Sequence, residues 1–99
     1  MFIHNVYFWF KSGLPKSAAQ AMIADGEAIL KKIPTVRHIW SGMPTGQGRD
    51  IVDNSYDVGL CVAFDDSAGH DLYQDHPLHK QYIERHGKNW ERIVVYDFR

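Results

Sequence analysis

The sequence contains a single cysteine among its 99 residues, and this excludes an internal disulfide framework. Because Cys61 lies inside an apolar run, we expect it to be a small buried hydrophobic residue. No apolar stretch approaches the ~20 residues that a membrane-spanning helix needs. The beginning of the chain also lacks the charged and apolar regions of a signal peptide. We therefore expect an unprocessed cytoplasmic protein with no membrane partner.

The sequence also lacks an excess of charge of either sign. Its 11 basic and 12 acidic residues give a formal net charge of −1, without the basic stripe of a nucleic-acid-binding protein. We therefore expect no nucleic-acid partner. An apolar content of 44% is ordinary for a globular protein, and 99 residues suffice for one domain with one modest core. Because small domains bury little surface alone, the 13% aromatic content favours oligomerisation.

The apolar pattern predicts four strands and two helical regions. The first helix follows Ser17, a suitable N-cap, and ends at about Ile33 because Pro34 stops it. Tyr56 is expected to point to the same side of its strand as Val58. The predicted strands are 2–10, 36–43, 56–64 and 92–98, and the predicted helices are 17–33, 67–74 and 77–87.

This order of elements is typical of the ferredoxin-like α+β fold, βαββαβ, over a single domain of residues 1–99. In that fold the helices cover one face of a four-stranded antiparallel sheet. The other face is also apolar here and needs a partner. We therefore expect a homodimer that associates through the sheet faces and closes into an α/β barrel.

The loop of residues 44–55 is long for a compact domain, which favours either a lid or a contact arm in a dimer. Its Gly46-Gln47-Gly48 fragment does not lead from a buried strand into a helix, so a phosphate-binding loop is not expected.

Residues 72–86 hold three of the six histidines and two of the five tyrosines. Pro77 cannot continue a helix and restricts the residue before it, so the helix should break at His76. The break places Tyr73, His76 and His79 near one corner, and we expect any chemical site to lie there. His4 lies on an otherwise hydrophobic face of the first strand.

Three segments together resemble one known family. They are the opening strand with His4, the corner Tyr73-x-x-His76-Pro77-x-His79, and the segment Val94-Val95-Tyr96-Asp97-Phe98. The sequence is similar over nearly its whole length to the stress-responsive dimeric α/β-barrel (Dabb) family, and distantly to its polyketide (olivetolic acid) cyclases. The resemblance implies a ferredoxin-like protomer that dimerises through its sheet, with a stress-associated role.

In those cyclases, which need no cofactor, a histidine acts as general base. The resemblance places that base at His79, a supporting tyrosine at Tyr73 and a cavity histidine at His4. A further cavity histidine of the cyclases falls at Val58 in this sequence. The implied substrate-binding residues are Val6, Val58, Leu60, His76 and Tyr82.

The chemistry is consistent with these residue types. Histidine has an unperturbed pKa of roughly 6.5, which suits proton abstraction next to a carbonyl at neutral pH. A tyrosine hydroxyl can stabilise the developing enolate by a hydrogen bond. The structural alternatives are that His4 and His79 make internal hydrogen bonds, that His76 caps a helix, and that Tyr73 is a core aromatic.

Several classes of function remain open at this point. The first is a small-molecule-binding, stress-associated dimer without catalysis, and the second is a cofactor-independent cyclase, lyase or isomerase. A monooxygenase of the related dimeric barrels has no distinguishing residue here. A metal centre at His76, His79 and His86 would need converging ligands that the proline break separates, so we expect none.

Overall fold

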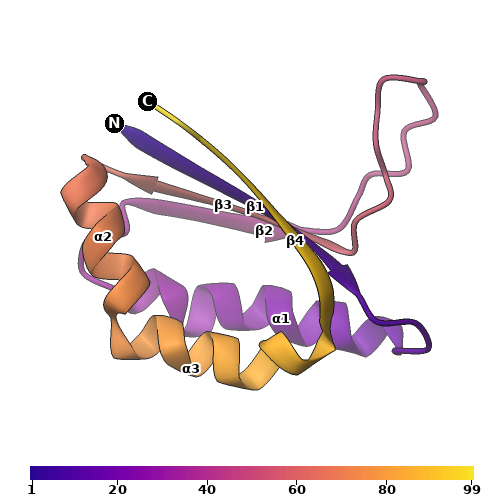
Figure 1. Cartoon of the computed structure of the whole chain (residues 1–99), viewed down its shortest axis with the longest axis horizontal. Helices are drawn as coiled ribbons and strands as arrows, with labels where there is room; N and C mark the ends of the chain where they lie inside the picture. Colours follow the sequence, from indigo (N-terminus) through magenta and orange to yellow (C-terminus); the bar gives the residue numbers. More distant parts are fainter.

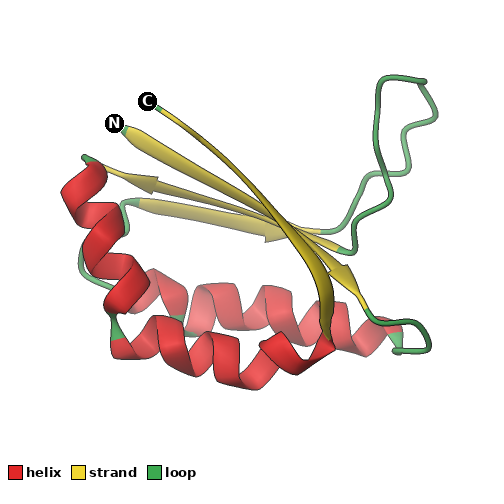
Figure 2. Cartoon of the chain, viewed as in Figure 1, coloured by secondary structure: helices red, strands yellow, loops and turns green.

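The computed structural model describes all 99 residues as one sheet with helices on one face (Figures 1 and 2). The strands are antiparallel and lie in the order β2-β3-β1-β4, which confirms the predicted ferredoxin-like α+β fold. None of the helices has the length and hydropathy of a membrane span. The elements are β1 (Phe2–Phe10), α1 (Lys16–Ala28), η1 (Leu30–Lys32), β2 (His38–Gly42), β3 (Val58–Phe64), α2 (Ser67–Asp75), α3 (Pro77–His86), η2 (Gly87–Asn89) and β4 (Trp90–Phe98).

The strand register decides which side chains face the helices. Val6 lies between Leu60 of β3 and Val95 of β4, and all three point to the helix side. The neighbouring row runs from Cys61 through Asn5 to Tyr96 and points to the opposite face. We call this opposite side the open face, because no helix covers it (Figure 1).

The core lies between the helix side of the sheet and the helices. Apolar side chains of α1 and of the turn η1 are buried there, including Met22 and Leu30. Gly26 of α1 lies close to β2, since a Cβ atom at Gly26 would be 3.7 Å from the Cβ of Ser41. The helix α1 therefore approaches the sheet closely at this glycine.

The ends of the first helix differ from the prediction. Ser17 is wrong as the N-cap, because α1 begins at Lys16, directly after an extended Pro15, and has no side-chain cap. The α-helix also ends at Ala28 and not near Ile33. A single 3-10 turn follows, and Ile33 is extended, as a residue before proline prefers.

The third strand begins later than expected, at Val58. The Asp57 backbone N–H donates to the Phe8 carbonyl, and the Asp57 carboxylate accepts from the Phe10 N–H at 2.7 Å. These contacts turn the chain, so Tyr56 does not share the side of Val58. Its ring packs instead on Tyr7 of the open face, with 5.0 Å between centroids. Cys61, expected to be buried, is only partly buried because it also points to the open face.

The helical region after β3 breaks where the proline predicts. His76 is extended between α2 and α3, and its Nδ1 accepts a hydrogen bond from the Leu78 N–H at 3.1 Å. His76 therefore caps the start of α3, which is one of the structural alternatives for this residue. Pro77 occupies the first turn of that helix.

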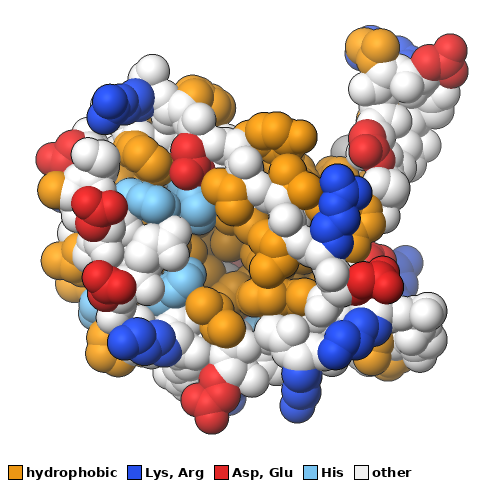
Figure 3. Space-filling view, viewed as in Figure 1, with side chains coloured by type: hydrophobic (Ala, Val, Ile, Leu, Met, Phe, Trp, Pro, Cys, Tyr) orange, Lys and Arg blue, Asp and Glu red, His pale blue; other side chains and the backbone are white.

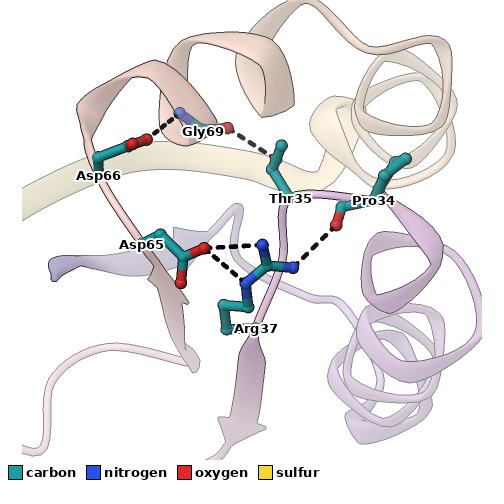
Figure 4. Close-up of polar contacts among 6 residues, drawn as sticks. All are labelled: Pro34, Thr35, Arg37, Asp65, Asp66 and Gly69. Atoms are coloured by element: carbon teal, nitrogen blue, oxygen red, sulfur yellow. Dashed lines mark hydrogen bonds and ion pairs between the residues drawn. The ribbon is translucent and has the colours of Figure 1, made fainter.

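The start of α2 is anchored by a small group of polar contacts (Figure 4). The Asp66 carboxylate accepts from the Gly69 N–H at 2.9 Å, and the Thr35 hydroxyl donates to the Gly69 carbonyl at 2.8 Å. Next to this group, Arg37 pairs with Asp65 at 2.7 Å. These contacts hold α2 against the segment that leads into β2.

Candidate functional site: a cavity beneath β4

A cavity of about 170 Å³ lies between the helix side of β1 and β4 and the helices α2 and α3. In the space-filling view, hydrophobic side chains surround a hollow with histidines along one edge (Figure 3). The cavity opens beside β4, where no helix covers the half-exposed Ile93 and Val95. Four larger surface hollows contain no histidine. The lining residues are His4, Val6, Phe8, Leu60, Tyr73, Gln74, His79, Tyr82, Ile83, Trp90, Ile93 and Val95.

The structure brings Tyr73 and His79 together across the proline break. Their ring centroids are 4.7 Å apart, although the two residues lie on different helices. The centroid of the His4 ring lies 5.9 Å from that of Tyr73. The corner expected from the sequence therefore exists in space, and the chemical roles of its members remain predictions.

His79 is one of three cavity side chains with unused hydrogen-bonding capacity, together with Tyr82 and Trp90. Its Nδ1 is buried and has no hydrogen-bond partner in the protein. Burial lowers the pKa of His79, and the neighbouring His4 and His70 act in the same direction, while the Gln74 backbone carbonyl opposes them. The ring is therefore uncharged at neutral pH, and one of its nitrogens has a free lone pair.

The two tyrosines of the cavity are hydrogen-bond donors. Burial raises the pKa of both Tyr73 and Tyr82 above the ordinary value of a phenol. Both hydroxyls therefore keep their protons across the physiological pH range. The Tyr82 hydroxyl is buried and has no partner within the protein.

His4 has a partner, as its structural alternative requires. It is only 4% exposed, and its Nδ1 lies 2.6 Å from Oδ1 of Asp97. The two residues face each other directly in the β1–β4 register. The carboxylate pairs with Nδ1 and fixes the orientation of the His4 ring, so Nε2 is the nitrogen left for a further polar contact.

The other predicted binding residues divide into two groups. Val6, Leu60 and Tyr82 line the cavity. Val58 does not, because it is fully buried in the core. His76 does not either, since its ring serves as the cap of α3.

The three histidines considered as metal ligands, His76, His79 and His86, lie in separate surroundings. Nε2 of His86 lies 2.7 Å from Asp25 of α1, which also pairs with Arg85. His76 is used in capping and His79 faces the cavity.

Sequence reasoning missed two polar residues of this region, Asp97 and His70. Alternation along β4 puts Asp97 on the same side as Val95, so an acid beside His4 on the helix side of the sheet could have been found by fixing the strand register. His70 lies three residues before Tyr73 on α2, hence on the same helix face. Its ring centroid is 4.6 Å from that of His4.

Fold and cavity together define a ferredoxin-like protomer with a histidine- and tyrosine-lined cavity beneath its last strand. The chain matches the Stress responsive A/B Barrel Domain (Dabb) family over residues 2–99, and it belongs to that family. Among curated protein sequences, none matches it significantly.

Solved structures of similar fold include a Dabb family protein from Mesorhizobium loti, with 26% identity and a TM-score of 0.77 over 98% of this chain and 93% of that one. A dimeric ferredoxin-like protein of unknown function from Thermobifida fusca has 20% identity and a TM-score of 0.83 over 98% and 88%. A hydroxynitrile lyase from Passiflora edulis has 18% identity and a TM-score of 0.82 over 98% and 90%. The likenesses at 20% and 18% identity establish the shared fold.

Proposed function

We propose that this protein is a cytoplasmic homodimer that binds a small organic molecule in the cavity beneath β4, in a stress-associated role. The observation that carries the proposal is the buried, unpartnered Nδ1 of His79 beside the Tyr73 hydroxyl-bearing ring. A buried polar atom without a partner is costly, and a ligand polar group would remove that cost.

The composition of the cavity supports this proposal. Binding sites for small molecules are mainly apolar and contain a few polar groups that fix orientation. Here the polar groups are His79, Tyr73 and Tyr82, set among aliphatic and aromatic side chains. A volume of about 170 Å³ lies below the roughly 300–1,000 Å³ of drug-sized sites, which favours a single ring or a short chain.

Ligand binding is tested by histidine-ring NMR spectra recorded with a panel of β-keto acids and phenolic acids. We expect one class to shift the resonances of His79 and His4, while those of His38, exposed on β2, stay unchanged. The ligand-induced shift of the His4 resonance should disappear in His79→Phe and weaken in Tyr73→Phe. Equal shifts in both variants and in the wild type would contradict binding at this cavity.

A second candidate function is cofactor-independent catalysis on a carbonyl substrate, of the cyclase or lyase type. It is favoured by an uncharged imidazole, His79, next to a protonated phenol, Tyr73. In this step a His79 nitrogen takes the proton from the carbon next to the carbonyl. The C–H electron pair forms the enolate, and the Tyr73 hydroxyl donates a hydrogen bond to the enolate oxygen.

Exchange of that proton for solvent deuterium tests the step without knowledge of the final product. We expect the wild type to accelerate exchange in a β-keto ester and His79→Ala to abolish the acceleration. Tyr73→Phe should reduce it by about tenfold or more. Sedimentation of His79→Ala should still show the wild-type association state, and an unchanged exchange rate in this variant would exclude His79 as the base.

The proposed dimer rests on the open face of the sheet. Tyr96 and Phe98 of β4 are 64% and 63% exposed there, and the exposed Trp40 of β2 lies on the same face at the opposite edge of the sheet. A face with this many exposed aromatic side chains is typical of an interface. A second copy of the same sheet would cover it.

We propose that the 44–55 loop is a contact arm of this dimer. The loop extends beyond the sheet on the side away from the helices (Figure 1). Its base is fixed to the open face, since the Trp9 indole N–H donates to the Ser55 hydroxyl at 3.0 Å. No loop residue lines the cavity, so the arm is favoured over a lid.

A further inference from the structure

We propose that His4, His70 and Asp97 form a binding site for a divalent transition-metal ion such as Zn²⁺. One ring nitrogen from each histidine and one carboxylate oxygen lie within 4.8 Å of one another. The three side chains come from β1, α2 and β4, so only the folded chain brings them together. The site shares His4 with the cavity, but neither His79 nor Tyr73 takes part in it.

The separations are close to those that a metal requires. With metal–ligand bonds of about 2.1 Å in a tetrahedral arrangement, ligand atoms lie about 3.4 Å apart. The His4–Asp97 pair, at 2.6 Å, would open slightly, and His70 would move inward by side-chain rotation. A cation between His4 and Asp97 would bind the lone pair of His4 Nδ1 in the tautomer that carries the ring proton on Nε2, and it would take the place of their hydrogen bond.

The surroundings of the three side chains are those of a built site. His4 is buried, the His70 side chain is 14% exposed, and that of Asp97 is 31% exposed, so a cation could enter from solvent. The His70 ring is stacked on Phe2, with centroids 4.6 Å apart and planes 19° apart. Its Nε2 contacts the Gln74 amide at 2.9 Å. Contacts of this kind orient ligating histidines and limit the rotation lost on binding.

The donor set selects the class of ion. Two imidazoles and one carboxylate suit Zn²⁺ and its neighbours in the first transition series, whereas Mg²⁺ and Ca²⁺ prefer oxygen ligands. Two uncharged rings with one carboxylate also give the site a formal charge of −1, which favours a cation. Three protein ligands leave the fourth tetrahedral position for a water molecule.

The test is a Co²⁺ titration of the untagged, EDTA-treated full chain, followed by visible absorption and then by Zn²⁺ competition. We expect one Co²⁺ per chain, displaced by Zn²⁺. Affinity should fall at least tenfold in Asp97→Asn and in His70→Phe, which keeps an aromatic ring on Phe2. The matched control is His38→Phe, whose ring is exposed on β2 and stacks only on Trp40, and it should bind as the wild type does.

A second measurement on the unaltered protein covers the case in which a variant fails to fold. Paramagnetic Co²⁺ should broaden the ring resonances of His4 and His70 most strongly, and those of His38 and His86 least. Broadening centred on any other histidine, or equal affinity in His70→Phe and wild type, would overturn the proposal. His79→Phe should retain the metal and lose only the organic ligand, so the two proposals fail separately.

Discussion

Two histidines beneath β4 have opposite surroundings. Nδ1 of His4 has a carboxylate at 2.6 Å, whereas Nδ1 of His79 has no partner in the protein. The first ring is held in place by its partner, and the second is available to an incoming molecule. The difference between the partnered and the unpartnered imidazole therefore depends on Asp97, a residue 93 positions away from His4.

The lowered pKa of His79 predicts a dependence of stability on pH. As pH falls through about 6.5, the unfolded chain protonates this residue first, because burial disfavours the charged ring in the folded chain. Stability is therefore greatest above pH ~6.5 and falls as pH decreases through the lowered pKa. Thermal unfolding at pH 7.5, 6.5 and 5.5 measures this loss.

The same series on His79→Phe should show a smaller fall in melting temperature between pH 7.5 and 5.5. His38→Phe, which alters an exposed ring, should follow the wild type. Parallel curves for the wild type and His79→Phe would contradict the assignment.

The buried hydroxyl of Tyr82 predicts a stabilising substitution. A buried polar atom without a partner costs about 1–3 kcal/mol, and Tyr82→Phe removes the hydroxyl while keeping the ring. We expect the free energy of unfolding to rise by about 1 kcal/mol, measured by urea denaturation. Tyr82→Leu, which also loses ring contacts with Trp90, should lower it. A loss of stability in Tyr82→Phe would show that the hydroxyl has a partner.

At the scale of elements, the capping contacts at the start of α2 connect the sheet to the corner. Asp66→Ala removes the acceptor of the Gly69 N–H and should destabilise the protein by about 1 kcal/mol. Asp65→Ala is the matched control, because it removes only an exposed pair with Arg37, and such pairs contribute about 0–1 kcal/mol. Chemical denaturation of the two variants would contradict the capping argument if Asp65→Ala were the more destabilised.

The elements that could be predicted from sequence are those governed by strong local rules. Pro77 breaks its helix for steric reasons that no tertiary contact overrides, so the break at His76 was found correctly. Ser17 failed as a cap, because Pro15 already has the extended conformation from which a helix can start. The predicted orientation of Tyr56 was wrong because Asp57 makes hydrogen bonds to β1, and the alternation of residues along a strand does not predict such a contact.

In the candidate site, too, the residues placed by local rules could be predicted and those placed by long-range contacts could not. Tyr73 and His79 flank a local break, and their proximity could be anticipated from the corner alone. Asp97 and His70 belong to the site only through the β1–β4 register and the packing of α2 on the sheet. Such long-range placement has no signal in local periodicity.

At the scale of the whole molecule, the open face predicts the effect of a charge on association. Tyr96→Glu places a carboxylate in the proposed interface, where burying an unpaired charge is strongly unfavourable. We expect sedimentation to show a dimer for the wild type and a monomer for Tyr96→Glu. Leu72→Glu, on the exposed side of α2, is the control and should remain dimeric. A dimer in both variants would place the interface elsewhere.

Strand β4 contributes side chains both to the cavity and to the open face of the sheet. Ile93, Val95 and Asp97 border the cavity side, while Tyr96 and Phe98 alternate with them toward the open face. Any shift of this strand on self-association must therefore also move the wall of the cavity. By thermodynamic reciprocity, a ligand that favours one position of β4 changes the dimerisation constant by the same factor by which dimerisation changes its affinity. For the proposed dimer and its proposed ligand, the concentration of the protein would therefore regulate how much of the cavity is occupied.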